Sequence, residues 1–94
     1  MNLINLFTED KPLQTKKIFV SHEGVTTIQL MADAQLKEHV TKVPAFLVCV
    51  TGEVVFENEK RILEKLLPGD FVNIEPEVKH WLMAHRDSLL LLIK

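Results

Sequence analysis

Two histidines and one cysteine are the residues whose types and positions suggest chemistry. His39 precedes the apolar run from Ala45 to Val50, and His80 follows the segment PGDFVNIEPEVK. Two imidazoles in one pocket can bind a metal ion or exchange protons near neutral pH. Cys49 lies inside the apolar run, and no neighbouring cation in the sequence favours its thiolate, so we expect a small buried hydrophobe.

The elements that must position these residues read as short strands. Patterns rich in β-branched and apolar residues predict strands at 25–31, 35–40, 45–50, 53–56, 71–74, 80–85 and 89–93, with a further short one at 16–20. Turn residues lie between them at 51–52, 57–60, 68–70 and 86–88. We expect the turns at 51–52 and 86–88 to be hairpin tips. Short strands at this spacing predict an all-β antiparallel sandwich or barrel.

The segment NEKRILEKLL, residues 58–67, supports two interpretations. Its apolar residues Ile62, Leu63, Leu66 and Leu67 follow helical spacing among good helix formers. The flanking turn signals favour a strand, because tertiary context often overrides intrinsic propensity. We predict a strand, with a helix as the alternative.

The strand predicted at 45–50 bears on assembly. It is apolar on both faces, with Ala45, Leu47 and Cys49 on one and Phe46, Val48 and Val50 on the other. A strand with one wet face alternates apolar and polar residues, so both faces here must be covered. One face lines the interior and the other meets a second sheet or a second subunit. We favour a homodimer, with a two-sheet sandwich inside one chain as the alternative.

Composition narrows the classes of function. The 94 residues carry 11 basic and 13 acidic side chains, and the basic ones are scattered. We therefore expect neither nucleic acid nor a membrane as a partner, because both attract clustered positive charge. One cysteine excludes an internal disulfide, and the first residues do not resemble a secretory signal. These features predict one cytoplasmic domain.

Two blocks carry a family resemblance. LKEHVTKVPAFLVCVTGEVVF, residues 36–56, and LLPGDFVNIEPEVKHWLMAH, residues 66–85, resemble the two sequence motifs of the cupin superfamily in a minimal single-domain form. The resemblance implies a small antiparallel β-barrel of the jelly-roll type with a double sheet. It covers residues from about 25 to 93 and implies a single cupin-like domain over 1–94, with its core at about 25–93 and an N-terminal strand or arm at 1–24. In that family, three histidines and a glutamate bind a divalent metal inside the barrel.

The match to the metal ligands is incomplete. His39 and His80 stand at two of the ligand positions, whereas Thr41 and Ala45 stand where the family has a histidine and the glutamate. Pro76 lies one place late and Glu77 replaces a common glycine. His39 and His80 are therefore the two candidate ligands for zinc, iron, manganese or nickel, and we see no third ligand. Catalytic metal sites use three protein ligands and a water.

The resemblance also implies which residues line the pocket and what the protein does. We expect a pocket lined by His39, Thr41, Ala45, Leu47, Cys49, His80 and Leu82. Our first hypothesis is that it binds a small organic molecule without catalysis. The alternative is a metal-dependent oxygenase or isomerase that uses His39 and His80 with a further ligand. A third hypothesis is an interaction module whose pocket is vestigial.

Overall fold

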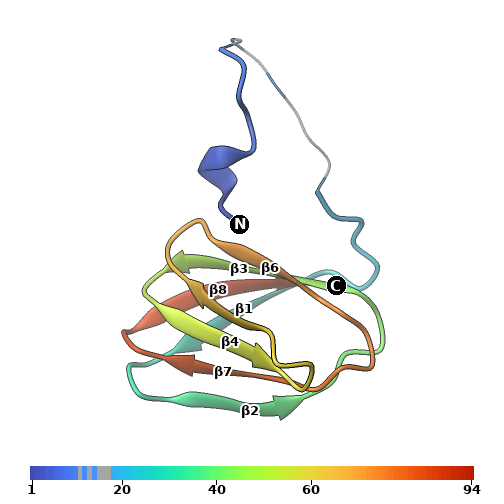
Figure 1. The fold of residues 1–94 in the computed structure, drawn as a ribbon, viewed down its shortest axis with the longest axis vertical. Coiled ribbons are helices and arrows are strands. Elements are labelled where there is room, and N and C mark those ends of the chain that lie inside the picture. The colour runs from blue at the N-terminus through green and yellow to red at the C-terminus, as the bar shows by residue number, and fades with distance from the viewer. Residues whose placement is uncertain (11, 13, 15–17) are drawn as a thin grey trace.

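Eight antiparallel strands form two four-stranded sheets in a computed structural model of the chain, which describes residues 1–94 except 11, 13 and 15–17 (Figure 1). One short 3-10 helix, η1, spans Leu3–Asn5. The strands are β1 Val25–Leu30, β2 Gln35–His39, β3 Ala45–Thr51, β4 Val54–Asn58, β5 Leu63–Leu66, β6 Phe71–Ile74, β7 His80–Ala84 and β8 Ser88–Ile93. These bounds confirm seven of the predicted strands, and β5 confirms the strand predicted within 58–67.

The strand order is that of a double-sheet jelly roll. One sheet has the order β1-β8-β3-β6 and the other has the order β2-β7-β4-β5. The chain changes sheet at every connection except the one between β4 and β5. The two sheets lie face to face, so the inward side chains of both form one core (Figure 1). The predicted all-β antiparallel fold is confirmed.

Two predicted hairpins are wrong. The turn at Thr51-Gly52 leads from β3 to β4, but β3 pairs with β6 and β8, whereas β4 pairs with β5 and β7. The turn at 86–88 likewise joins β7 and β8, which belong to different sheets. Both segments reverse the chain between layers instead of within one. The physical reason is that turn residues specify a change of direction, while burial of the strand faces selects the pairing partner.

The β4–β5 connection is the one true hairpin between consecutive strands. Asn58 is buried, and its side-chain oxygen Oδ1 accepts hydrogen bonds from the backbone N–H groups of Lys60 at 2.9 Å and Ile62 at 3.1 Å. Arg61 takes a left-handed backbone conformation with φ of 66°. This turn takes the place of the first residues of the helix that was the alternative for 58–67. In β5 only Leu66 is buried, so the helical spacing of the other apolar residues does not create a buried stripe.

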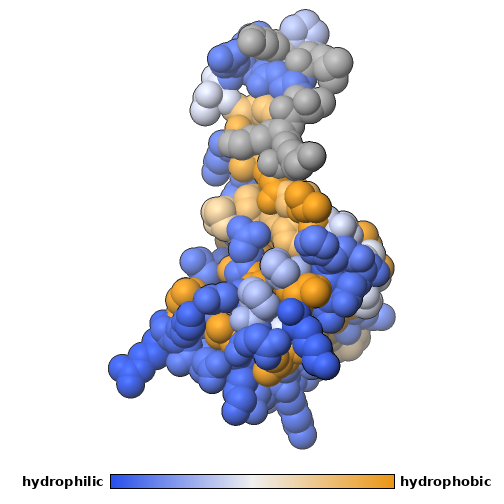
Figure 2. Space-filling model, turned by 90° about the vertical axis from the view of Figure 1, so that its right-hand side faces the viewer, coloured by the Kyte–Doolittle hydropathy of each residue, from blue (hydrophilic) through white to orange (hydrophobic). Residues whose placement is uncertain are grey.

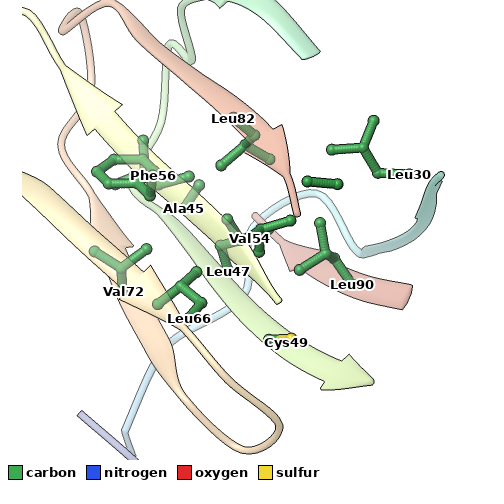
Figure 3. Close-up of a cluster of buried hydrophobic side chains, with 12 residues drawn as sticks. Leu30, Ala45, Leu47, Cys49, Val54, Phe56, Leu66, Val72, Leu82 and Leu90 are labelled. Carbon is green, nitrogen blue, oxygen red and sulfur yellow. The ribbon is translucent and has the colours of Figure 1, made fainter. Parts of the chain in front are cut away.

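The two faces of β3 are buried in different ways. Ala45, Leu47 and Cys49 point into the core between the sheets, together with residues such as Phe56 and Leu90 (Figure 3). The outward side chains Phe46 and Val48 form a second cluster with Phe71. Partly buried side chains from the N-terminal segment pack on that cluster: Leu6, Ile18 and Phe19.

This arrangement changes the argument for a second subunit. From the sequence, the outer face of β3 is expected to meet another sheet or another chain, but residues that precede β1 cover much of it. Apolar surface is visible where the N-terminal segment meets the two-sheet body (Figure 2). Val50 stays exposed on this face, with 41% of its surface accessible. The homodimer stays a prediction.

The N-terminal segment is fastened at its beginning. The backbone of Leu3 donates to the Gly69 carbonyl at 2.8 Å, and Phe71 donates to the Met1 carbonyl at 2.9 Å. The Asn2 side chain donates to the Asp70 carboxylate at 2.8 Å. Of the strand predicted at 16–20, residues 16 and 17 lie outside the described residues, and 18–20 belong to no strand. Within the described part of the chain, no helix has the length and apolar character to cross a membrane.

Candidate functional site

A cavity of about 250 Å³ opens between the two sheets at one end of the sandwich. The last residues of β2 and β8 and the first residues of β1 and β7 lie at this end (Figure 1). Most of the wall is aliphatic, and the polar residues are two histidines, a threonine and a lysine. The lining residues are Thr26, Ile28, Leu36, His39, Leu47, Ile74, His80, Leu82, Leu92 and Lys94.

Strand register brings the two histidines together. His39 at the end of β2 pairs with His80 at the start of β7, and Leu36 pairs with Leu82 on the same two strands. The register shifts between Leu36 and His39. Strict alternation would send side chains three positions apart to opposite faces, so this irregularity is what lets both line the cavity. The imidazole rings of His39 and His80 meet edge to face, with their centroids 5.9 Å apart.

His80 is the buried member of the pair. It is 3% exposed, and its ring stacks on Phe56 at a centroid distance of 5.8 Å. Its Nδ1 has no hydrogen-bond partner among the described residues. Burial lowers the pKa of His80 below its ordinary value. The backbone of Val78 opposes this shift, and the positive charges of His39 and Lys94 add to it, so the neutral imidazole is favoured.

Four of the seven residues predicted to line the pocket do so: His39, Leu47, His80 and Leu82. The other three, Thr41, Ala45 and Cys49, are almost wholly buried but do not line this cavity. The hydroxyl oxygen of Thr41 has no hydrogen-bond partner in the described part of the chain.

Six lining residues are not among those predicted from the sequence. All of them except Lys94 lie in predicted strands: Thr26, Ile28, Leu36, Ile74 and Leu92. The place of Thr26, Ile28 and Leu92 at the cavity depends on the pairing of β1 with β8. The sequence did contain a signal for Leu92: it and its neighbour Leu91 are both apolar, so alternation along the strand turns one of them inward. What was lacking was the pairing that places β1 beside β8.

Cys49 is a buried thiol, as expected. It is 0% exposed, and its Sγ–H donates to the carbonyl oxygen of Thr51 at 3.4 Å. Burial raises the pKa of the Cys49 thiol, and the negative charge of Asp70 raises it further. A thiol of this kind is a poor nucleophile, because the thiolate is the reactive form.

The residues at this end do not fit a resident metal. His39 and His80 supply two imidazoles, and the positions of the family's second histidine and glutamate are held by Thr41 and Ala45. In the part of the chain that the structure describes, no group of three or more histidine, cysteine, aspartate or glutamate side chains gathers in a suitable arrangement. Two imidazoles alone hold a divalent ion weakly compared with the usual three or four ligands.

A second, larger hollow of about 460 Å³ lies on the outer face of the sheet β2-β7-β4-β5. Trp81 and Met83 line it together with residues of both charges, such as Lys37 and Glu57. It is more open than the cavity between the sheets. We take the smaller cavity as the candidate site because it encloses the histidine pair and a buried nitrogen without a partner.

Comparison with solved structures identifies the architecture. A cupin superfamily protein from Desulfitobacterium hafniense matches with a TM-score of 0.70 and 14% identity, over 100% of this chain and 87% of that one. The CENP-C cupin domain from Drosophila melanogaster matches with a TM-score of 0.69 and 20% identity, over 76% of this chain and 56% of that one.

The chain has a cupin fold. A protein of unknown function from Streptococcus pyogenes is also similar, with a TM-score of 0.67 and 13% identity over 95% of this chain and 96% of that one. The match spans only 56% to 59% of the length of the CENP-C chains. No protein-family model matches the sequence, and no curated protein matches it significantly. The likeness therefore establishes a small cupin-type fold and leaves the activity to the site itself.

Proposed function

We propose that this cupin-fold protein binds a small, largely apolar molecule in the cavity between its sheets and does not catalyse a reaction on it. The observation that carries the proposal is the aliphatic cavity with His39 and His80 on its wall. Binding sites for small molecules are typically apolar hollows with a few placed polar groups. The cupin fold supports the existence of such a hollow but says nothing about its occupant.

The side chains present argue for binding over catalysis. A nucleophilic mechanism needs an activated nucleophile next to a base, but Cys49 is a buried thiol whose pKa is raised. His39 and His80 face each other without a carboxylate in the cavity wall to orient either ring. A cytoplasmic location is part of the proposal, because a single free cysteine suits a compartment that keeps thiols reduced.

The alternative is a metal-dependent enzyme that uses His39 and His80. The pairing of these residues on adjacent strands is the observation in its favour. Elemental mass spectrometry of untagged protein purified without chelator tests it, beside His39→Ala and His80→Ala. Near-stoichiometric metal that both substitutions remove would make this alternative lead. Metal far below one ion per chain, unchanged by either substitution, would leave the binding proposal.

The binding proposal is tested by filling the cavity. Leu92→Trp places a large ring among the aliphatic side chains of the wall, whereas Leu91→Trp changes the neighbouring residue, which packs on the outer cluster instead. The two variants are a matched pair on one strand. Each is titrated with a panel of neutral and ionic molecules of about six to ten non-hydrogen atoms, followed by amide chemical shifts.

We expect at least one compound to shift the signals of His80 and Leu82, with affinity lost in Leu92→Trp and kept in Leu91→Trp. Melting temperatures confirm that both variants fold. No binding by any compound, or equal binding by both variants, would contradict the proposal and favour the third hypothesis, an interaction module with a vestigial pocket.

A further inference from the structure

The titratable side chains on the wall of the cavity are all basic. Among its lining residues, His39, His80 and Lys94 carry basic nitrogens, and no lining residue has an acidic side chain. Lys94 is partly buried, and within the described residues its side chain forms no ion pair with an aspartate or glutamate. Positive charge that the protein does not neutralise attracts a negatively charged ligand.

The buried imidazole is an independent indication of a polar ligand group. His80 lines the cavity, and only 3% of its surface is exposed. Its Nδ1 atom has no hydrogen-bond partner in the described part of the chain. A buried polar atom without a partner costs free energy that a bound group or a water molecule can recover. His80 lies beside His39, and the charge of Lys94 acts on its ring, so three polar side chains share the wall of the cavity.

The remainder of the cavity specifies the rest of the ligand. Its aliphatic wall consists of Ile28, Leu36, Leu47, Ile74, Leu82 and Leu92. The volume of about 250 Å³ corresponds to roughly eight water-sized groups, since each occupies about 30 Å³ in the liquid. The ligand is therefore small and mostly apolar, with room for one polar head.

This inference rests on the proposed binding function and names the ligand class. We propose that the cavity binds a short aliphatic monocarboxylate, with its carboxylate at Lys94 and the two histidines and its chain among the aliphatic side chains. A carboxylate accepts several hydrogen bonds at once, so it satisfies an ammonium group and an imidazole N–H together. A neutral molecule of the same shape leaves the positive charge of Lys94 without compensation.

The test compares two ligands of equal size. Hexanoate and hexanamide both have eight non-hydrogen atoms, but only hexanoate is charged. Each is titrated at about pH 8, where unperturbed histidines are neutral and lysine is charged, into wild-type protein, Lys94→Gln and Lys65→Gln. Lys65 lies on β5, away from the cavity, and is the matched control.

We expect hexanoate to bind about tenfold more tightly than hexanamide, because hydrogen bonds to ionised groups are the stronger ones. Lys94→Gln weakens hexanoate about tenfold and hexanamide less than about twofold, and Lys65→Gln changes neither. Equal binding of both ligands by the wild type, or an equal loss of both in Lys94→Gln, overturns the anion inference and leaves the binding function standing. If neither ligand binds while another compound in the panel does, the ligand class is wrong. If no compound binds at all, the proposed function itself fails.

Discussion

The space between the two sheets is closed at one end and hollow at the other, although the same strands run through both. At the closed end Cys49, Val54, Ala84 and Leu90 are each 0% exposed. At the other end, residues of β1, β2, β3, β6, β7 and β8 line the cavity. On β8 the change occurs within one step, since Leu90 is fully buried and Leu92, the next inward residue, lines the cavity.

The difference shows how one fold separates stability from binding. The closed end is filled by side chains without charged groups, so close packing supplies most of its stabilisation. The hollow end carries His39, His80 and Lys94, whose polar groups cannot be packed against aliphatic neighbours without a partner. Substitutions at the closed end should therefore affect stability most, and substitutions at the hollow end should affect binding most.

The largest effect is expected at the closed end from Gly52→Ala. Gly52 has φ of 94°, and an added Cβ would lie 2.5 Å from the Asp87 carbonyl oxygen and 2.7 Å from the Ser88 Cα. Backbone strain and overpacking each cost about 1–3 kcal/mol, so we expect a loss of roughly 3 kcal/mol or more in unfolding free energy. Urea unfolding measures it. Gly24→Ala has no atom within 4 Å of its added Cβ and serves as the control for φ alone.

A second prediction compares the two ends directly on β8. Leu90→Ala removes a fully buried side chain and should cost about 3 kcal/mol. Leu92→Ala enlarges a hollow that already exists, and Leu92 is only partly buried, so we expect about 1 kcal/mol. Chemical denaturation of both variants gives the difference. Equal costs would mean that the two ends are packed alike and would contradict the comparison.

A third prediction concerns pH at the hollow end. The unfolded chain protonates His80 near its ordinary value of 6.5, whereas the folded protein does so only at lower pH. The unfolded state therefore binds more protons as the pH falls below about 6.5, and the stability contribution present at higher pH is lost through that window. His80→Leu should flatten the fall in melting temperature between about pH 7 and 5. His22→Leu, in an exposed turn, should leave it unchanged; identical curves for all three proteins would contradict the assignment.

The smallest effect is expected from an ion pair on the surface. Lys60 and Glu75 approach to 2.8 Å, but their side chains are 53% and 54% exposed. Exposed pairs of this kind are worth about 0.5 kcal/mol or less, because solvent screens them and both side chains lose conformational freedom. A double-mutant cycle with Lys60→Gln and Glu75→Gln measures the coupling. A coupling above about 1.5 kcal/mol would show that surface charge stabilises this region more than its packing suggests.

Strand positions were predictable because each depends on local composition. The strands around Phe71 and Leu89 are recognisable in the sequence as β-branched and apolar residues between turn signals. The layers that the turns connect were not predictable in the same way. Thr51-Gly52 has the sequence of a hairpin, yet the inward faces of β3 and β4 belong to opposite sheets. That choice depends on contacts between residues far apart in the sequence.

The candidate site was predictable only where a motif defined it. His39 and His80 came from motif spacing, and register confirms that they are neighbours. Lys94 carries no motif, and its place at the cavity follows from the pairing of β8 with β1 and β3. Cys49 was placed in the pocket by alternation along β3, but it lies at the closed end, one step beyond Leu47. Alternation gives the face of a residue and not its depth.

The hydrogen bonds between residues 1–3 and residues 69–71 bear on how two molecules could associate. β6 is one of the two edge strands of its sheet, and its first residue, Phe71, donates its backbone N–H to the carbonyl oxygen of Met1. An uncovered strand edge offers its backbone groups to another chain and invites aggregation. Met1 and Asn2 occupy the start of that edge, and the same segment shields Phe46 and Phe71 from water. Met1 and Asn2 thus occupy the backbone groups at the start of the β6 edge, which a second molecule would otherwise be able to pair with.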